Sequence, residues 1–547
     1  MSARTSVSVV ACLLLAACGG GAEETPEGST GAGTATASRG TTTTGGGTAG
    51  GATAVMAMDI SDAVTADPAE SYETGSGLMV RQTYDTLVDF EGEEVDHVVP
   101  ALAASWDLPT AGDGKWTFHL DPNATFHDGS PVTAEDVVYS FQRALALELT
   151  PVWLLQLIGF NPDTATAVDS HTVEMTFDPE LSPDIILSIL TFPVAGIVSK
   201  AMAEEHANNG DYGHEWVRSN SAGSGPYVLS AWERDSRMEF TANPSYWRPA
   251  PQIGRAVVQH VPESETQSIM LESGDIDISA NVNPEQRDSL EGAGMQIVPV
   301  KVNVLIYLGM NVTHEAFANE QVRTAVKYAI DYNGLINDVL GGAAIFNQGI
   351  LPDGFLGSDT SVAFEYDPER AKQLLSDAGY PDGFSVEFTV PTGADVTGVA
   401  NAEIAAKIQS DLAAVGITAE IQQLAGATLL ERYRAQGLQL VLMYWGADYP
   451  DPDANAKAFG DDSVKQLAYR NAWHDDAIVQ LVQSAAKETD RGTREQMYTD
   501  IVHQIQERGP FVILYQPTRN YAVSPKIQNF IVNPQAGLRF SDFQKQG

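Results

Sequence analysis

The sequence predicts an α/β protein with two or more lobes, and two observations carry that prediction. The chain has 547 residues, 43% of them hydrophobic, which is ample for large cores and too long for one ordinary domain. Segments with strand and helix patterns also alternate along the chain, most regularly between residues 384 and 445. Strands that are joined through helices pair in parallel, with the helices covering the sheet.

Caps and apolar spacing mark three helices. In 131–146, Thr133 takes the N-cap position and apolar residues follow at helical spacing. The segment 320–331 repeats apolar residues every three or four positions. The segment 367–379 begins with Asp367 as N-cap and Pro368 at the first helical position, and a glycine ends it.

Three strands are expected downstream, at 384–390, 417–423 and 438–445, with helices around 402–415 and 428–436 between them. Ligands of open α/β sheets bind beyond the carboxyl ends of the strands. The stretch YWGADYPDPDAN, residues 444–455, begins where the third strand ends. The sequence therefore places Gly446 to Asp453 where a binding loop is expected.

The N-terminus reads MSARTSVSVVACLLLAACGG. Its apolar stretch, Val9 to Ala17, is too short to span a bilayer and resembles a secretory signal. The stretch ends in Leu-Ala-Ala-Cys, which looks like a bacterial lipobox, so we expect residues 1–17 to be removed and Cys18 to carry lipid. The alternative is an ordinary signal followed by a chance cysteine.

The segment from 18 to 53 is rich in Gly and Thr and poor in apolar residues. Such a composition cannot offset the entropy of ordering, so we expect a flexible tether. The chain has 2 Cys, and Cys12 lies in the segment that is removed. The folded part is therefore expected to have no disulfide.

The chain carries 31 basic and 72 acidic residues, a net charge of −41. Nucleic acid and anionic lipid head groups are poor partners for such a surface. Cationic or zwitterionic solutes are easier to accept. A salty habitat also favours acidic surfaces, and most of the carboxylates are expected to be solvated.

Five passages, in order along the chain, resemble the extracytoplasmic solute-binding proteins of peptide and nickel ABC importers. They are VVPALAASWDLPTAGDGKWTFHLDPNATFHDGSPVTAEDVVYSFQRAL from Val98, GSGPYVLSAWERDSRMEFTANPSYWRP from Gly223, NEQVRTAVKYAID, YDPERAKQLLSDAGYPDG and WGADYPDPDAN. The resemblance covers nearly everything from Ala54 onward. It is a resemblance to family 5 of these proteins, the dipeptide, oligopeptide and nickel type.

The resemblance implies a two-lobed periplasmic-binding-protein-like fold, type II and of the large cluster C type, which closes about a hinge. The first lobe would comprise 54–305 and 518–547, with an extra subdomain at about 98–230. The second lobe would run from 306 to 517. The chain would cross between the lobes near VLIYLGMN and ILYQPTRN.

The resemblance also implies a ligand site. In peptide-binding relatives an Asp in the W-x-A-D-Y type loop pairs with the ligand's α-amino group, and Asp448 matches it. A buried ammonium needs a charged partner, and Trp445 and Tyr444 would supply apolar walls and cation–π contact. Tyr307 and Asn311, near the crossing, are further candidates. The segment from Tyr72 to Thr74 is a guess for the first lobe's side of the cleft. No Arg stands out as partner for a peptide's carboxylate.

Other signals are read as structural. Asp451 and Asp453 are expected to shape a turn with their prolines, because the calcium-loop pattern lacks the required Gly and Glu. HDG at 127–129 is read as a turn, and HANNGDYGHE at 206–215 as a solvated loop without metal-ligand spacing. No catalytic motif is present in the sequence, so we expect neither an enzyme nor a cofactor.

The resemblance therefore implies a lipid-anchored receptor that works as a monomer and faces the periplasm or cell exterior. It would capture di- or oligopeptides and deliver them to ABC permease subunits. One alternative is a non-transport peptide-signal receptor. Another is an importer receptor for a nickel chelate, an opine or an oligosaccharide, because fold does not fix substrate.

Overall fold

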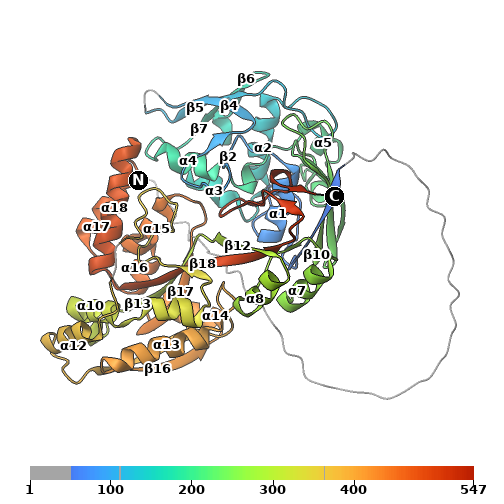
Figure 1. Cartoon of the computed structure of the whole chain (residues 1–547). Helices are drawn as coiled ribbons and strands as arrows, with labels where there is room; N and C mark the ends of the chain where they lie inside the picture. The colour runs from blue at the N-terminus through green and yellow to red at the C-terminus, as the bar shows by residue number, and fades with distance from the viewer. Residues whose placement is uncertain (1–50, 110–111, 362–363, 547) are drawn as a thin grey trace, which may run out of the picture. The chain divides into compact units, whose positions relative to one another are not determined.

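The computed structural model describes residues 51–109, 112–361 and 364–546 (Figure 1). The expected signal segment, Cys18 and residues 18–50 of the expected tether lie outside these ranges. The first described strand, β1 (Ala52–Met58), already includes the last two residues assigned to the tether. Within the described ranges no helix is long and apolar enough to cross a membrane.

One mixed sheet of twelve strands runs through the described chain. Ten of its strands follow one another in the order β16 (Ile417–Leu424), β15 (Phe384–Pro391), β17 (Leu440–Gly446), β13 (Val304–Met310), β18 (Phe511–Val523), β11 (Ile278–Ser279), β1, β10 (Ile253–His260), β9 (Arg237–Ala242) and β8 (Tyr227–Glu233). Two more, β12 (Gln296–Lys301) and β14 (Ala344–Ile345), pair with β18.

Strand β18 joins the two halves of this sheet. It has 13 residues and is therefore about 40 Å long. Its first residues pair with β13, and its last residues pair with β12 and β11. The two crossings expected from the sequence lie on β13 and β18, which are antiparallel neighbours.

The half that contains β13 confirms the downstream elements expected from the sequence. Strands β15, β16 and β17 run parallel, and β13 is antiparallel to β17. The helices of this half are α10 (Glu320–Ala329), α12 (Pro368–Asp377), α13 (Asn401–Ala414) and α14 (Gly426–Arg434) (Figure 1). At the start of α12 the Asp367 side chain accepts the N–H of Arg370, as an N-cap does.

A separate antiparallel sheet has the order β4 (Ala103–Asp107), β5 (Lys115–Leu120), β7 (Thr172–Thr176) and β6 (Thr166–Asp169). Helix α2 (Ala134–Leu147) packs beside it and confirms the helix expected at 131–146. The N–H of Thr133 donates to the carboxylate of Asp136 at 2.9 Å, which closes the first turn.

Three large hydrophobic cores lie in different parts of the chain. One fills the β13 half of the long sheet, with residues from Ile306 to Tyr515. A second lies against the β1 half, and its residues come from 54–300 and 521–543. The third surrounds the four-stranded sheet and also includes Tyr449 and Ala486. The lobe boundaries that the resemblance implies stay a prediction, and the third core takes residues from both sides of them.

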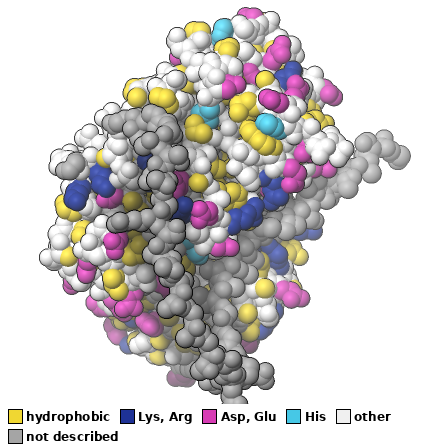
Figure 2. Space-filling view, turned by 90° about the vertical axis from the view of Figure 1, so that its right-hand side faces the viewer, with side chains coloured by type: hydrophobic (Ala, Val, Ile, Leu, Met, Phe, Trp, Pro, Cys, Tyr) yellow, Lys and Arg dark blue, Asp and Glu magenta, His cyan; other side chains and the backbone are white. Residues whose placement is uncertain are grey.

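The remaining helices of six or more residues in the described ranges lie outside the elements named so far. They are α1 (Thr74–Thr83), α3 (Val152–Leu157), α4 (Pro183–Ile189), α5 (Lys200–Glu205), α7 (Ser264–Ser273), α8 (Arg287–Gly292), α15 (Pro452–Gly460), α17 (Asp476–Ala485) and α18 (Arg491–Arg508). On the face seen in Figure 2, acidic side chains are spread over the surface with basic ones among them.

Candidate functional site

The loop after β17 leaves the sheet at the edge where parallel β15 also ends. At this edge Gly446 lies opposite Val304 of β13, and the N–H of Ala447 donates to the carbonyl of Asn303 at 3.2 Å. The loop ends at Asp451, which caps α15 by accepting the N–H of Asp453 at 2.9 Å. Strand pairing on one side and a helix cap on the other fix the position of Asp448.

Asp448 is half-buried, and its side chain meets a residue from far away in the sequence. The hydroxyl of Tyr72 donates to Oδ1 of Asp448 at 2.7 Å. Burial raises the pKa of the Asp448 carboxyl, and the hydrogen bond from Tyr72 offsets part of that rise. No basic side chain of the described chain forms an ion pair with Asp448. The site therefore holds a carboxylate that lacks a cation.

Two further residues of the proposed first lobe touch the same loop. Nδ2 of Asn303 donates to Oε1 of Gln535 at 2.9 Å, and Nε2 of Gln535 donates to the carbonyl of Asp448 at 3.3 Å. The remaining side-chain oxygen of Asn303 is buried and has no hydrogen-bond partner among the described residues. An acceptor therefore lies near Asp448 with nothing bonded to it.

Trp445 and Tyr444 are the last two side chains of β17 before its terminal glycine, and successive residues of a strand face opposite sides. Trp445 is half-buried, and its indole N–H is buried without a partner in the described ranges. Tyr444 is 38% exposed. Trp445 thus offers an apolar ring and an N–H donor three residues before Asp448.

The structure places the other two candidates inside the protein. Tyr307 has no exposed surface, packs edge-on against Phe459 and Phe511, and its hydroxyl lies 3.3 Å from that of Tyr433. Asn311 donates to the carbonyl of Gln436 at 2.9 Å and accepts the N–H of Thr313 at 2.9 Å. Both side chains make their hydrogen bonds to other residues of the protein, so we leave Tyr307 and Asn311 out of the proposed site.

Asp451 and Asp453 are buried and ion-paired. Asp451 accepts from Nη2 of Arg494 at 2.6 Å, and Asp453 lies 2.7 Å from Nζ of Lys457. The sequence indicated their turn-shaping role, but not their basic partners. In the part of the chain that the structure describes, no group of three His, Cys, Asp or Glu side chains could hold a metal ion.

The two histidine segments have different outcomes. HDG forms the expected turn, with Gly129 at φ +84°. The solvated-loop interpretation of 206–215 is wrong for His214, whose ring is 14% exposed and whose Nδ1 lies 2.8 Å from a carboxylate oxygen of Asp67. Asp67 also receives two hydrogen bonds from Arg143. This cluster holds the segment that leads to Tyr72.

Comparison with known proteins identifies the family and the fold of the chain. Residues 97–466, well over half of the chain, match the family of bacterial extracellular solute-binding proteins, family 5 Middle. The chain belongs to this family. Family members bind solutes and do not transform them, so the solute-binding protein described here is not an enzyme.

Two curated relatives and one solved structure show how far the similarity extends. The solute-binding protein is 29% identical over 488 residues to the probable D,D-dipeptide-binding periplasmic protein DdpA of Escherichia coli (strain K12), covering 87% of this chain and 90% of DdpA. It is 28% identical over 464 residues to di/tripeptide-binding protein 2 of Pseudomonas aeruginosa (strain UCBPP-PA14), covering 81% and 86%. The structure of HbpA2 from Haemophilus parasuis has a TM-score of 0.81 at 24% identity, covering 90% of this chain and 100% of HbpA2. The fold is the two-lobed type II fold of periplasmic binding proteins.

Proposed function

We propose that this solute-binding protein captures peptides with a free amino terminus between its lobes and delivers them to the permease of an ABC importer. Asp448 pairs with the ligand's ammonium group. Trp445 and Tyr444 form apolar walls around it. The protein is a monomer, held to the membrane by lipid on Cys18.

The observation that carries this proposal is the half-buried Asp448 carboxylate without a basic partner in the described chain. A partly desolvated carboxylate costs free energy unless a cation compensates for it. A solute's ammonium supplies that cation, and the Tyr72 hydroxyl supplies one hydrogen bond from the other proposed lobe. An ammonium group bound to Asp448 would therefore lie where Tyr72 of one proposed lobe meets Asp448 of the other.

Polar groups around Asp448 also suit a peptide backbone. The indole N–H of Trp445 and Oδ1 of Asn303 are both buried without hydrogen-bond partners among the described residues. A peptide carbonyl can accept from the first, and a peptide N–H can donate to the second. Generic backbone bonds of this kind permit several side chains. A peptide ligand also fits the names of two relatives, a probable D,D-dipeptide-binding protein and a di/tripeptide-binding protein.

A thermal-shift screen tests the proposal. The protein is heated with pools of di-, tri- and longer peptides, each pool in free and N-acetylated form. A ligand at about a hundred times its dissociation constant adds roughly 2.7 kcal/mol of stability. We expect a rise in Tm with free peptides alone, and we expect Asp448→Asn to abolish it. Tyr72→Phe serves as the matched variant, because it keeps the carboxylate and should keep the preference for free amines.

Other outcomes separate the alternatives. A shift with both peptide forms would keep peptide binding and remove Asp448 as the amine partner. No shift with any pool would exclude peptides of those lengths and turn the search to nickel chelates, opines and oligosaccharides. A receptor that only passes a peptide signal would show the shift but no uptake of labelled peptide in cells.

A further inference from the structure

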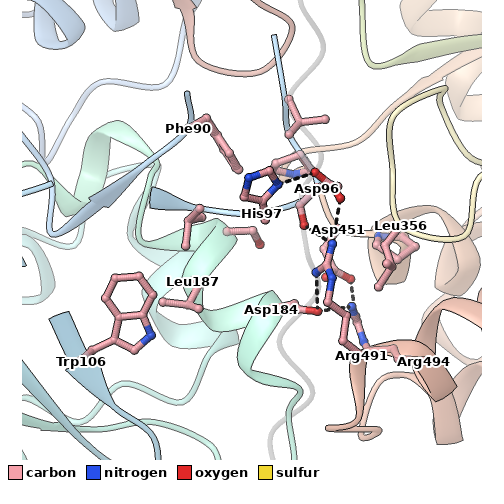
Figure 3. A pocket seen from close by; sticks show the side chains of 15 residues that line it. Phe90, Asp96, His97, Trp106, Asp184, Leu187, Leu356, Asp451, Arg491 and Arg494 are labelled. Atoms are coloured by element: carbon pink, nitrogen blue, oxygen red, sulfur yellow. Dashed lines mark hydrogen bonds and ion pairs between the residues drawn. The ribbon is translucent and has the colours of Figure 1, made fainter. Parts of the chain in front are cut away.

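A cluster of charged side chains, which includes Asp451 of the loop that carries Asp448, joins the two proposed lobes (Figure 3). Asp184, in the first turn of α4, accepts from Nη1 of Arg491 at 3.2 Å and from Nη1 of Arg494 at 3.4 Å. Arg494 also donates to Asp451 at 2.6 Å. We call these four residues the arginine clamp.

The clamp has a buried arm and a partly exposed arm. The side chains of Arg494 and Asp451 are 0% and 3% exposed, whereas those of Asp184 and Arg491 are 30% and 41% exposed. Arg491 makes a second contact with the first lobe, donating to the carbonyl and the carboxylate of Asp96 at 2.9 Å each. Burial lowers the pKa of Arg494, but the nearby charges of Asp451 and Asp184 outweigh burial and raise this pKa above its ordinary value, so Arg494 stays charged.

The position of the two arginines argues for a role beyond the stability of α18. They occupy the first and fourth positions of this helix, where the helix dipole disfavours cations. The carboxylates of Asp184 and Asp96, from the other proposed lobe, compensate for that placement. Arg491 is therefore satisfied by contacts between the lobes, whereas Arg494 has one such contact, with Asp184, besides its pair with Asp451.

The clamp and the ligand residue share one loop. Asp451 lies three residues after Asp448, and Tyr449 between them belongs to the hydrophobic core of the four-stranded sheet. The clamp residues line a cavity of about 230 Å³ together with Phe90, Trp106 and Leu187 of the first lobe. If α18 moves away from α4, the ion pair between Arg494 and Asp451 transmits this movement to the loop that carries Asp448.

We propose that the arginine clamp holds the loop of Asp448 against the first lobe and that it must open before a bound solute leaves. This proposal rests on the proposed function, because it assigns the clamp to the release step of the same site. Amine capture at Asp448 and clamp formation at Asp451 then favour the same arrangement of the lobes. The clamp acts through the loop and does not touch the ligand.

Two measurements on the full-length protein test the clamp. Hydrogen–deuterium exchange reports the opening of residues 447–455 without any ligand. Spin labels on Val168→Cys and Tyr366→Cys, in a chain whose Cys12 and Cys18 are replaced by serine, report the distance between the proposed lobes. Both labelled positions are exposed, at 54% and 45%.

We compare Asp184→Asn and Arg491→Gln with Lys487→Gln. Lys487 and Glu180 also form an ion pair between the lobes, at 2.9 Å, but their side chains are 58% and 70% exposed, so this pair is expected to contribute almost nothing. We expect both clamp variants to speed exchange in 447–455 several-fold and to lengthen and broaden the label distance. The double variant should lose less than the sum of the two single losses, because both variants remove the contact between Asp184 and Arg491, whereas each also removes a contact of its own.

Unchanged exchange and unchanged distances in both folded clamp variants would overturn the proposal. Neither readout needs a ligand, so failure of the peptide screen does not affect them. If a peptide is found, its dissociation should be about tenfold faster from Asp184→Asn than from Lys487→Gln. Equal dissociation rates would separate the clamp from solute release even where peptide binding holds. The unfolding midpoint of each variant shows whether it is folded.

Discussion

At the scale of the residue, Asp448 combines partial burial with the absence of a basic partner in the described chain. Its raised pKa means that the folded protein favours the neutral carboxyl more than the unfolded chain does. The charged form that a ligand's ammonium needs is therefore maintained at some cost in stability. Groups that are arranged for binding often lower the stability of the free protein in this way.

This cost predicts opposite effects of pH on the free and the bound protein. The folded pKa of Asp448 lies above the unfolded value of 3.8, so between the two values the folded state binds more protons. Asp448 then adds stability as the pH falls through this window, and that stability is lost as the pH rises. Peptide binding needs the carboxylate, so it weakens as the pH falls through the same window.

The variant Asp448→Asn tests both the effect of the Asp448 charge on stability without ligand and its effect on peptide binding. Without ligand at pH 7 the variant should unfold at a slightly higher temperature than the wild type, because it lacks the partly desolvated charge. With free peptide it should show no further rise. A ligand-free variant that is clearly less stable at pH 7 would contradict the account of the raised pKa.

The sequence indicated Asp448 but not its surroundings. Its motif and its position after a buried strand are local signals, so both could be found along the chain. Tyr72 was only a guess, and Asn303 and Gln535 gave no signal, because their contacts with the loop join segments that are distant in sequence. Tyr307 and Asn311 lie near the crossing as expected, but local sequence does not show that their side chains face the interior.

At the scale of the element, caps and apolar spacing predicted α2, α10 and α12 closely, because these signals act within one helix. The spacing does not show that Lys327 of α10 is buried as well. Its Nζ donates to the carbonyls of Gln506, Glu507 and Gly509 at the end of α18, and burial lowers its pKa to about 7. A buried lysine thus caps another helix, which no single-helix signal reveals.

Lys327→Met should therefore destabilise the protein although it replaces a buried polar side chain by an apolar one. Carbonyls that lose their donor in the interior cost about 1–3 kcal/mol, so we expect a loss of about 2 kcal/mol in urea unfolding. Lys372→Met is the control, because Lys372 is 47% exposed and pairs with Glu369 on its own helix. Equal stability of the two variants would show that the cap contributes nothing.

At the scale of the whole molecule, length, composition and the family motifs predicted the α/β class, but the sequence did not predict that one mixed sheet of twelve strands runs through the described chain. The sequence could not predict that the third core takes in Tyr449 and Ala486, since packing between segments so far apart depends on the folded arrangement. The net charge of −41 disfavours binding of the protein surface to anionic lipid head groups, so the proposed lipid on Cys18 is the expected contact with the membrane.

The anchor gives a prediction for the intact cell. If Cys18 carries lipid, the protein should sediment with membranes and enter the detergent phase, whereas Cys18→Ser should be released in soluble form. Cell fractionation followed by detection with an antibody to residues 54–547 measures this. Cys12→Ser should behave like the wild type, because Cys12 lies in the segment that is removed. A soluble wild-type protein would leave an ordinary signal as the explanation.

The central claim is that Asp448 binds a solute's ammonium group. Calorimetric titration of one peptide found in the screen, in free and N-acetylated form, tests it most directly. Removing one partner of a buried charge pair costs roughly 2–5 kcal/mol, so acetylation should weaken binding by about thirtyfold or more. It should have little further effect on Asp448→Asn. Equal affinities of the two forms for the wild-type protein would contradict the claim.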